Sequence, residues 1–264
     1  MRSTLDSDFF VLPLPRVIAH RGASGDYPEN SLAAFRAAAD AGACYFELDV
    51  HLTRDGEVVV SHDSDLSRTC GLAASIADLL LADLKLADAG WGFGPSGEGF
   101  PFRGRGLKIP TLAEVFDAFP DQRYVIEVKQ AAPGLVAPIL DVIERAGMRR
   151  RVMAASESQA PLDEVRMLAP GIPTGFSYTE IAGFMASLAP GAELYQPRGD
   201  ALQIPPEYES WQLVTPESVA AAHRAGVEVH VWTVNEVAEM RALLALGVDG
   251  ILTDYPARLL ELLR

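Results

Sequence analysis

Two acidic residues, Glu47 and Asp49, stand two positions apart in the apolar, β-branched stretch of residues 44–52. In a β-strand, side chains at positions i and i+2 lie on the same face, so the two carboxylates point the same way. Burying such a pair is costly unless a proton or a cation compensates the charge, and carboxylate oxygens are ligands that hard divalent metals prefer. A solvated edge strand with ordinary surface charges is the alternative for this motif taken alone.

The same spacing recurs at Glu127 and Lys129, which pair an acid with a base. Glu47, Asp49 and Glu127 together offer three oxygen ligands, which matches a site for Mg²⁺ or Ca²⁺, with Mn²⁺ also possible. Zinc fits less well in a chain with so few cysteine and histidine residues. We therefore predict one divalent cation as cofactor, with positions left open for water or substrate.

His20 and His62 are the candidate proton carriers. Displacement at phosphorus needs a base that activates the nucleophile and an acid that protonates the leaving oxygen, and histidine titrates in the right range for both. A lone histidine is more often structural, but two that converge on an acidic cluster indicate catalysis. Arg21 and Lys129 would supply fixed positive charge for the non-bridging phosphate oxygens.

Several other polar or aromatic residues are open to two interpretations. Trp232 either lines the mouth of the site or fills the interior, and we keep it as a candidate substrate contact. We expect Asp254 to cap the final helix rather than to bind metal. We expect His223 on a helix surface, whereas His51 and His230 have no assigned role.

The elements that must position these residues alternate along the chain. Apolar runs predict eight parallel strands, which begin at or near Val17, Cys44, Tyr124, Val152, Ile172, Ala201, Val227 and Asp249. Helices are predicted at residues 32–41, 112–119, 134–146, 161–168, 179–188, 216–225, 236–246 and 256–263. Eight strands, each followed by a helix, predict an α/β protein with a (β/α)₈ TIM barrel, whose functional sites lie at the carboxyl ends of the strands.

One segment interrupts this alternation. Residues 57–61 follow the second strand too closely to form a parallel neighbour, so they predict a hairpin that brings His62 back toward Glu47 and Asp49. A helix at residues 76–87 and a glycine-rich aromatic loop at residues 88–106 follow. We predict a single catalytic domain over residues 1–264, with residues 51–110 as a small insertion that covers one barrel end. The aromatics of the loop are either part of the site or a satellite core.

Composition limits the possible partners. The chain has 264 residues and a formal net charge of −14, and its lysines and arginines form no run. Nucleic acid and anionic membrane surfaces are therefore not expected as partners. An anionic substrate would have to be attracted by a local cationic site.

Cysteine content and hydropathy favour a cytoplasmic protein without integral membrane association. Only Cys44 and Cys70 are present, which indicates no disulfide framework, and Cys44 is expected to be a buried thiol. The acidic, proline-containing N-terminal residues do not resemble a signal peptide, and no run approaches the roughly 18 apolar residues of a membrane span. The oligomeric state is not indicated.

An ordered set of motifs resembles the glycerophosphodiester phosphodiesterases from about residue 17 to the C-terminus. The motifs are HRG with PENS, ELDVHLTRDG, HD with L-x-R-T, IPTLAEV, IEVK, VWTVN and GVDGILTDYP. The resemblance implies a barrel with a small insertion after the second strand, and hydrolysis of a glycerophosphodiester to glycerol 3-phosphate and an alcohol. It implies site residues in three roles: metal ligands Glu47, Asp49 and Glu127, an acid/base pair His20 and His62, and phosphate contacts Arg21 and Lys129. The RTCGLAAS stretch departs from the family pattern, which affects the expected contacts to the alcohol.

Alternatives remain within and outside this family. Lysophospholipids, whose acyl chain could use the loop aromatics, compete with small water-soluble diesters as substrate. A metal-dependent barrel lyase or isomerase and a non-catalytic phosphodiester-binding homologue are the rivals from other classes. The assignment of acid and base, and of water or a glycerol hydroxyl as nucleophile, stays open.

Overall fold

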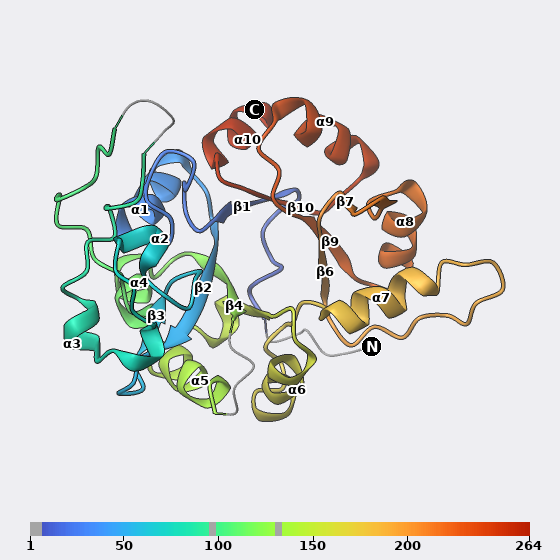
Figure 1. Cartoon of the computed structure of the whole chain (residues 1–264). Coiled ribbons are helices and arrows are strands. Elements are labelled where there is room, and N and C mark those ends of the chain that lie inside the picture. Colours follow the sequence, from blue (N-terminus) through green and yellow to red (C-terminus); the bar gives the residue numbers. More distant parts are fainter. Residues whose placement is uncertain (1–6, 95–98, 130–133) are drawn as a thin grey trace.

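The structure, a computed structural model, describes residues 7–94, 99–129 and 134–264 (Figure 1). A ring of parallel strands lies at its centre, in the order β5-β4-β2-β1-β10-β9-β6. These strands are β1 Arg16–His20, β2 Tyr45–Leu52, β4 Arg123–Val128, β5 Val152–Ala155, β6 Ala201–Ile204, β9 Glu228–Val231 and β10 Gly250–Thr253. Because β10 pairs with β1, the first and last strands of the chain lie side by side.

The ring is closed between β5 and β6 by a segment that we predicted as a full strand, residues 172–177. Only Thr174 and Gly175 form bridges there, Thr174 with Ala154 of β5 and Gly175 with Ala201 of β6. A longer ladder is disfavoured because Pro173 has no N–H group to donate and glycine weakens a strand. The eight-stranded barrel is therefore confirmed, with its fifth parallel strand reduced to two bridged residues.

Helices surround the ring, as Figure 1 shows. They are α1 Leu32–Ala41, α4 Leu112–Ala118, α5 Val136–Arg145, α6 Gln159–Leu168, α7 Tyr178–Ala186, α8 Pro216–Arg224, α9 Val237–Leu246 and α10 Pro256–Leu262. Short elements complete the chain: a 3₁₀ turn at Arg149–Arg151 and a hairpin of β7 Glu207–Tyr208 and β8 Trp211–Gln212. Thr111 and Glu114 form a capping box at the start of α4.

The segment between β2 and β4 begins with the predicted hairpin: β3 Val58–Val60 pairs antiparallel with β2. The single helix expected at residues 76–87 is wrong. The chain instead forms α2 Ser67–Cys70, a 3₁₀ turn at Ile76–Asp78 and α3 Leu81–Leu84. The break has a tertiary cause, since the Leu79 carbonyl accepts a hydrogen bond from the Arg54 backbone and the Leu81 N–H donates to Asp55.

A separate apolar cluster under this segment contains buried Leu66, Cys70, Ile76, Leu84 and Ile109. The aromatics of the following loop pack on one another and on their surroundings. Phe102 contacts Phe93 and Tyr27, and Arg103 lies over the rings of Trp91 and Phe100. Residues 95–98 of the predicted loop lie outside the described residues.

The amino-terminal end of the barrel is closed by Phe9, which is completely buried and packs edge-on against Tyr45. Cys44, expected to be buried, is exposed, because β2 begins one residue later. Among the described residues, no helix has both the length and the apolar character needed to cross a membrane.

Candidate active site

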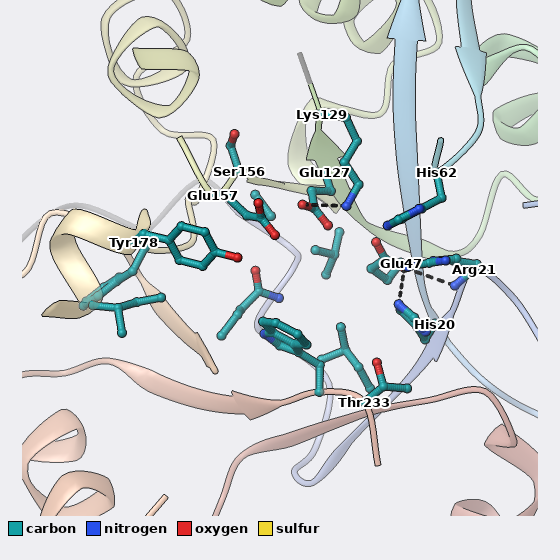
Figure 2. Close-up of a pocket in the computed structure, with 17 residues that line it drawn as sticks. His20, Arg21, Glu47, His62, Glu127, Lys129, Ser156, Glu157, Tyr178 and Thr233 are labelled. Carbon is teal, nitrogen blue, oxygen red and sulfur yellow. Dashed lines mark hydrogen bonds and ion pairs between the residues drawn. The ribbon is translucent and has the colours of Figure 1, made fainter. Parts of the chain in front are cut away.

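A cavity of about 160 Å³ opens at the carboxyl ends of the barrel strands (Figure 2). All the predicted site residues line it except Asp49, which is fully buried. The predicted members of the lining are His20, Arg21, Glu47, His62, Glu127, Lys129 and Trp232. The structure thus brings together residues from both ends of the sequence.

The three predicted acidic ligands form one cluster. Ligand oxygens of Glu47, Asp49 and Glu127 all lie within 4.8 Å of one another. The register explains this, because Asp49 and Glu127 are paired across β2 and β4 while Glu47 precedes Asp49 on the same face. Glu47 and Asp49 are 2% and 0% exposed, so their charges are not screened by water.

Two cations flank the cluster. Lys129 Nζ lies 2.9 Å from Glu127 Oε1 and 3.1 Å from Asp49 Oδ1, and Arg21 Nε lies 3.3 Å from Asp49 Oδ2. Asn30, which was not among the predicted site residues, donates a 2.8 Å hydrogen bond to Asp49 Oδ2. Burial alone would raise the pKa of Asp49, but Lys129, Arg21 and Asn30 outweigh burial and lower it.

Local backbone geometry places Arg21. Arg21 and Gly22 both have positive φ, 57° and 84°, so the chain turns sharply after β1. A Cβ on Gly22 would lie 2.6 Å from the Ala34 backbone of α1, which only glycine avoids. In this turn the Arg21 backbone N–H donates to Glu47 Oε2 at 3.1 Å.

The cluster fits a hard divalent cation by its donor set and by its electrostatics. Burial and the neighbouring charge of Asp49 raise the pKa of Glu47 to about 8. Burial likewise raises the pKa of Glu127 despite the adjacent Lys129. Arg21 and Lys129 therefore do not fully compensate the negative charge of the three carboxylates. Glu47, Asp49 and Glu127 are the residues that could hold a cation there.

His20 is held by a residue whose role the sequence reading missed. Its Nδ1 atom lies 2.7 Å from Asp254 Oδ1, and its Nε2 atom lies 3.9 Å from Glu47 Oε2. Asp254 also accepts hydrogen bonds from Ser24 and Asn235. Asp254 was expected to cap α10, but it makes no such bond there, because Tyr255 occupies the N-cap position.

These contacts affect the proton equilibria of both groups. Burial by itself would lower the pKa of His20, but the hydrogen bond to Asp254 and the charge of Glu47 outweigh it and raise the pKa. Burial would raise the pKa of Asp254, but its hydrogen bonds from His20, Asn235 and Ser24 lower it to about 2. Asp254 is therefore a permanent carboxylate acceptor for His20 near neutral pH.

His62 is held in a similar way. Its Nδ1 atom lies 2.7 Å from Asp63 Oδ1, and its backbone carbonyl lies 3.1 Å from Nε2 of the buried His51. The hairpin of β2 and β3 returns the chain to this point, and the Ser61 N–H donates to the Asp49 carbonyl. The predicted convergence of His62 on the acidic cluster is thus observed.

The opposite wall of the cavity was not anticipated. Figure 2 shows Glu157 and Tyr178 across the pocket from His20 and Arg21, with the Tyr178 hydroxyl near Glu157. Burial and the Glu157 carboxylate raise the pKa of Tyr178 to about 12. Trp232 also lines the pocket, so it lies at the mouth of the site. Its role as a substrate contact stays a prediction.

The remaining histidines lie outside the pocket. His223 is exposed on α8, as expected, and its Nε2 lies 2.8 Å from Asp249. His230 is fully buried beside Glu228 at the other end of the barrel.

Comparison with known proteins identifies a family that matches most of the chain. Residues 20–258 match the model of the "Glycerophosphoryl diester phosphodiesterase family". A glycerophosphodiester phosphodiesterase of Caldanaerobacter subterraneus subsp. tengcongensis is 35% identical over 94% of this chain and 97% of its own length. A lysophospholipase D of Mus musculus is 28% identical over 95% of this chain and 86% of its own.

A solved structure gives the same picture. A phosphodiesterase of Oleispira antarctica in complex with the product sn-glycerol 3-phosphate matches with a TM-score of 0.77 and 26% identity. The match covers 95% of this chain and 97% of that one.

Proposed function

The chain belongs to the glycerophosphoryl diester phosphodiesterase family and is a phosphoric diester hydrolase, and we propose that its substrates are small, water-soluble glycerophosphodiesters. The products would be glycerol 3-phosphate and an alcohol. The observation that carries the proposal is that two histidines, an arginine and a lysine converge at one cavity on a cluster of three carboxylates, of which Glu47 and Glu127 line the cavity and Asp49 lies buried beside it. This set provides an anion site and two proton carriers, which hydrolysis of a phosphodiester requires.

We assign the cation to Glu47, Asp49 and Glu127, with Mg²⁺ or Ca²⁺ as the first candidates and Mn²⁺ as the third. A divalent ion bound there would supply Lewis-acid stabilisation of the charge that develops on the phosphate oxygens. Arg21 and Lys129 orient the phosphate through fixed positive charge. Burial would lower the pKa of Lys129, but Asp49 and Glu127 raise it, so that this amine stays protonated.

His20 and His62 carry the protons. One accepts the proton of the attacking oxygen, which belongs to water or to a glycerol hydroxyl of the substrate, and the other donates a proton to the departing alkoxide. Each ring is bonded through Nδ1 to an aspartate, which leaves Nε2 as the nitrogen for proton transfer. General acid–base groups of this kind contribute about 10²–10⁴-fold each to the rate.

The size of the cavity favours small diesters over lysophospholipids. Its volume, about 160 Å³, is below the roughly 300–1,000 Å³ that is usual for drug-sized ligands. A long acyl chain would therefore extend beyond it. The similarity to a lysophospholipase D keeps lysophospholipids as the alternative substrates.

We also infer that residues 1–264 form one catalytic domain, in which residues 51–110 are an insertion over the barrel end. The separate apolar cluster under this segment supports the inference. So do the contacts that the segment makes with the β1–α1 loop, such as the ring contact between Phe102 and Tyr27.

The test uses protein stripped with chelator and incubated with glycerophosphocholine, with and without Mg²⁺, Ca²⁺ or Mn²⁺. We expect metal-restored release of glycerol 3-phosphate that falls about 10²–10⁴-fold in His20→Ala. His223→Ala, which removes an exposed histidine outside the pocket, is the matched control and should retain full activity.

Other outcomes would redirect the proposal. Release only from lysophosphatidylcholine would favour the lysophospholipid alternative. Full activity of chelated protein, or of Glu47→Gln without added metal, would remove the cation from the mechanism. No release from any diester would support a non-catalytic binding protein.

A further inference from the structure

Arg68 lies on α2, in the segment between β2 and β4, and does not line the cavity. Its guanidinium nevertheless donates three hydrogen bonds to two carboxylates. Nε donates to Asp63 Oδ2 at 2.7 Å, while Nη1 and Nη2 donate to the two oxygens of Glu29 at 2.6 and 2.8 Å. Such a bidentate, shared arrangement restricts geometry far more than a single surface ion pair.

The Asp63 branch leads to a proposed proton carrier. The other oxygen of Asp63 lies 2.7 Å from His62 Nδ1, so Arg68 and His62 hold the carboxylate from both sides. The hydrogen bond from Arg68 is the largest cause that lowers the pKa of Asp63, to about 2, and His62 adds to it. With both oxygens engaged, the carboxylate has one orientation, and the His62 ring follows it.

The Glu29 branch leads to the phosphate contact. Glu29 Oε1 accepts a 3.1 Å hydrogen bond from Arg21 Nη1, and Arg21 Nε lies 3.3 Å from Asp49. Glu29 comes from the loop before α1, so this branch connects the β1–α1 loop to α2. One side chain thereby joins two parts of the site that come from different segments.

We propose that Arg68 is a positioning residue that fixes His62 through Asp63 and Arg21 through Glu29. Arg68 does not line the cavity, so it would act only through these two carboxylates. The inference rests on the function proposed above. In this role, Arg68 would make the segment between β2 and β4 contribute to the geometry at the barrel mouth.

The variant Arg68→Met removes the guanidinium and keeps a side chain of similar length. We expect kcat to fall about 10–100-fold, as for other residues that orient an active group, and KM to rise because Arg21 is also released. Half of the Arg68 side chain is exposed, so the melting temperature should shift by no more than about 2–4 °C. Arg105→Met, at an exposed position of the same segment, is the control and should behave as wild type.

Double variants separate positioning from a general structural effect. In an Asp63→Asn background, Arg68→Met should lower kcat no further than about twofold. In a Glu29→Gln background, it should raise KM no further than about twofold. If Arg68→Met changes kcat in the Asp63→Asn background and KM in the Glu29→Gln background by the same factors as in the wild type, the proposal is contradicted.

Two further results keep the inference distinct from the proposed function. If the wild type is active and Arg68→Met has the same kcat and KM as the control Arg105→Met, the role of Arg68 is overturned and the proposed function stands. Wild type that releases no glycerol 3-phosphate from any diester would overturn the proposed function and this inference with it. If Arg68→Met fails to fold, Arg68→Lys replaces it, because lysine keeps the charge but cannot bind two carboxylates through a planar guanidinium. A lower kcat in folded Arg68→Lys supports the role of Arg68, whereas a wild-type kcat contradicts it.

Discussion

Both histidines of the pocket lie with Nδ1 against an aspartate, His20 against Asp254 and His62 against Asp63. A carboxylate in this position accepts a hydrogen bond from Nδ1–H, so it selects the tautomer in which Nε2 of the neutral ring carries no proton. Asp254 is itself held by two hydrogen bonds, since Ser24 donates to its Oδ1 atom and Asn235 donates to its Oδ2 atom. The orientation of both imidazole rings therefore depends on residues that do not line the cavity.

Asp254→Asn tests this orientation at the level of one residue. The amide can donate to Nδ1 and so favour the wrong tautomer of His20, which should lower kcat about 10–100-fold. Steady-state kinetics with glycerophosphocholine measures the effect, with Asp40→Asn on the exposed end of α1 as the control. An unchanged kcat would show that Asp254 does not orient the ring.

At the level of elements, β1 and β9 are joined at the amino-terminal end of the barrel although β10 lies between them. Arg16, 2% exposed, donates from Nε and Nη2 to the two oxygens of Glu228, each at 2.7 Å. His230 Nε2 lies 2.9 Å from the same carboxylate. Burial would raise the pKa of Glu228, but the hydrogen bonds from Arg16 and His230 outweigh it and lower the pKa to about 2.

This shift predicts how stability depends on pH. Because the pKa is depressed on folding, the contribution of Glu228 is complete above its ordinary value of 4.5 and is lost as the pH falls toward about 2. Glu228→Gln leaves Arg16 without its charged partner, so it should lower the free energy of unfolding at pH 7 by about 3–5 kcal/mol. The difference from wild type should shrink between pH 4.5 and pH 2.

Urea unfolding over this pH range measures the difference, with the exposed Glu57→Gln as the control. A difference between wild type and Glu228→Gln that does not change with pH would contradict a depressed pKa for Glu228.

At the level of the whole molecule, the two ends of the barrel differ: one end carries the candidate site and the other end is packed with apolar side chains. The carboxyl ends of the strands carry the site, and the other end is closed by the chain before β1. Phe9 is 0% exposed and packs on Tyr45, whose hydroxyl donates to the Phe9 carbonyl at 2.7 Å. Phe9 precedes the family-model match, which begins at residue 20, and it completes the core at this end of the barrel.

Phe9→Ala should therefore destabilise the protein without altering the site. The lost apolar contact and the cavity left behind should lower the free energy of unfolding by about 3–5 kcal/mol, measured by chemical denaturation. Val11→Ala, at a position that is 61% exposed, should stay within about 0.5 kcal/mol of wild type. Equal stabilities of the two variants would mean that the amino-terminal residues do not close the core.

Local patterns in the sequence determined the class of fold and most of the site. Strand and helix periodicity specified the alternation, and the i, i+2 spacing of Glu47 and Asp49 placed two carboxylates on one strand face. The short connection before residues 57–61 predicted the hairpin, which is observed. Such features are recognisable because the interacting residues are close in sequence.

Only the tertiary structure decided the contacts between distant residues. His20 and Asp254 are separated by 234 positions and meet because β10 pairs with β1 when the barrel closes. Arg68 likewise reaches Glu29 across 39 positions through the packing of α2 on the β1–α1 loop. The broken helix at residues 76–87 has the same origin, because the hydrogen bonds of Leu79 and Leu81 with residues 54 and 55 override local helix propensity.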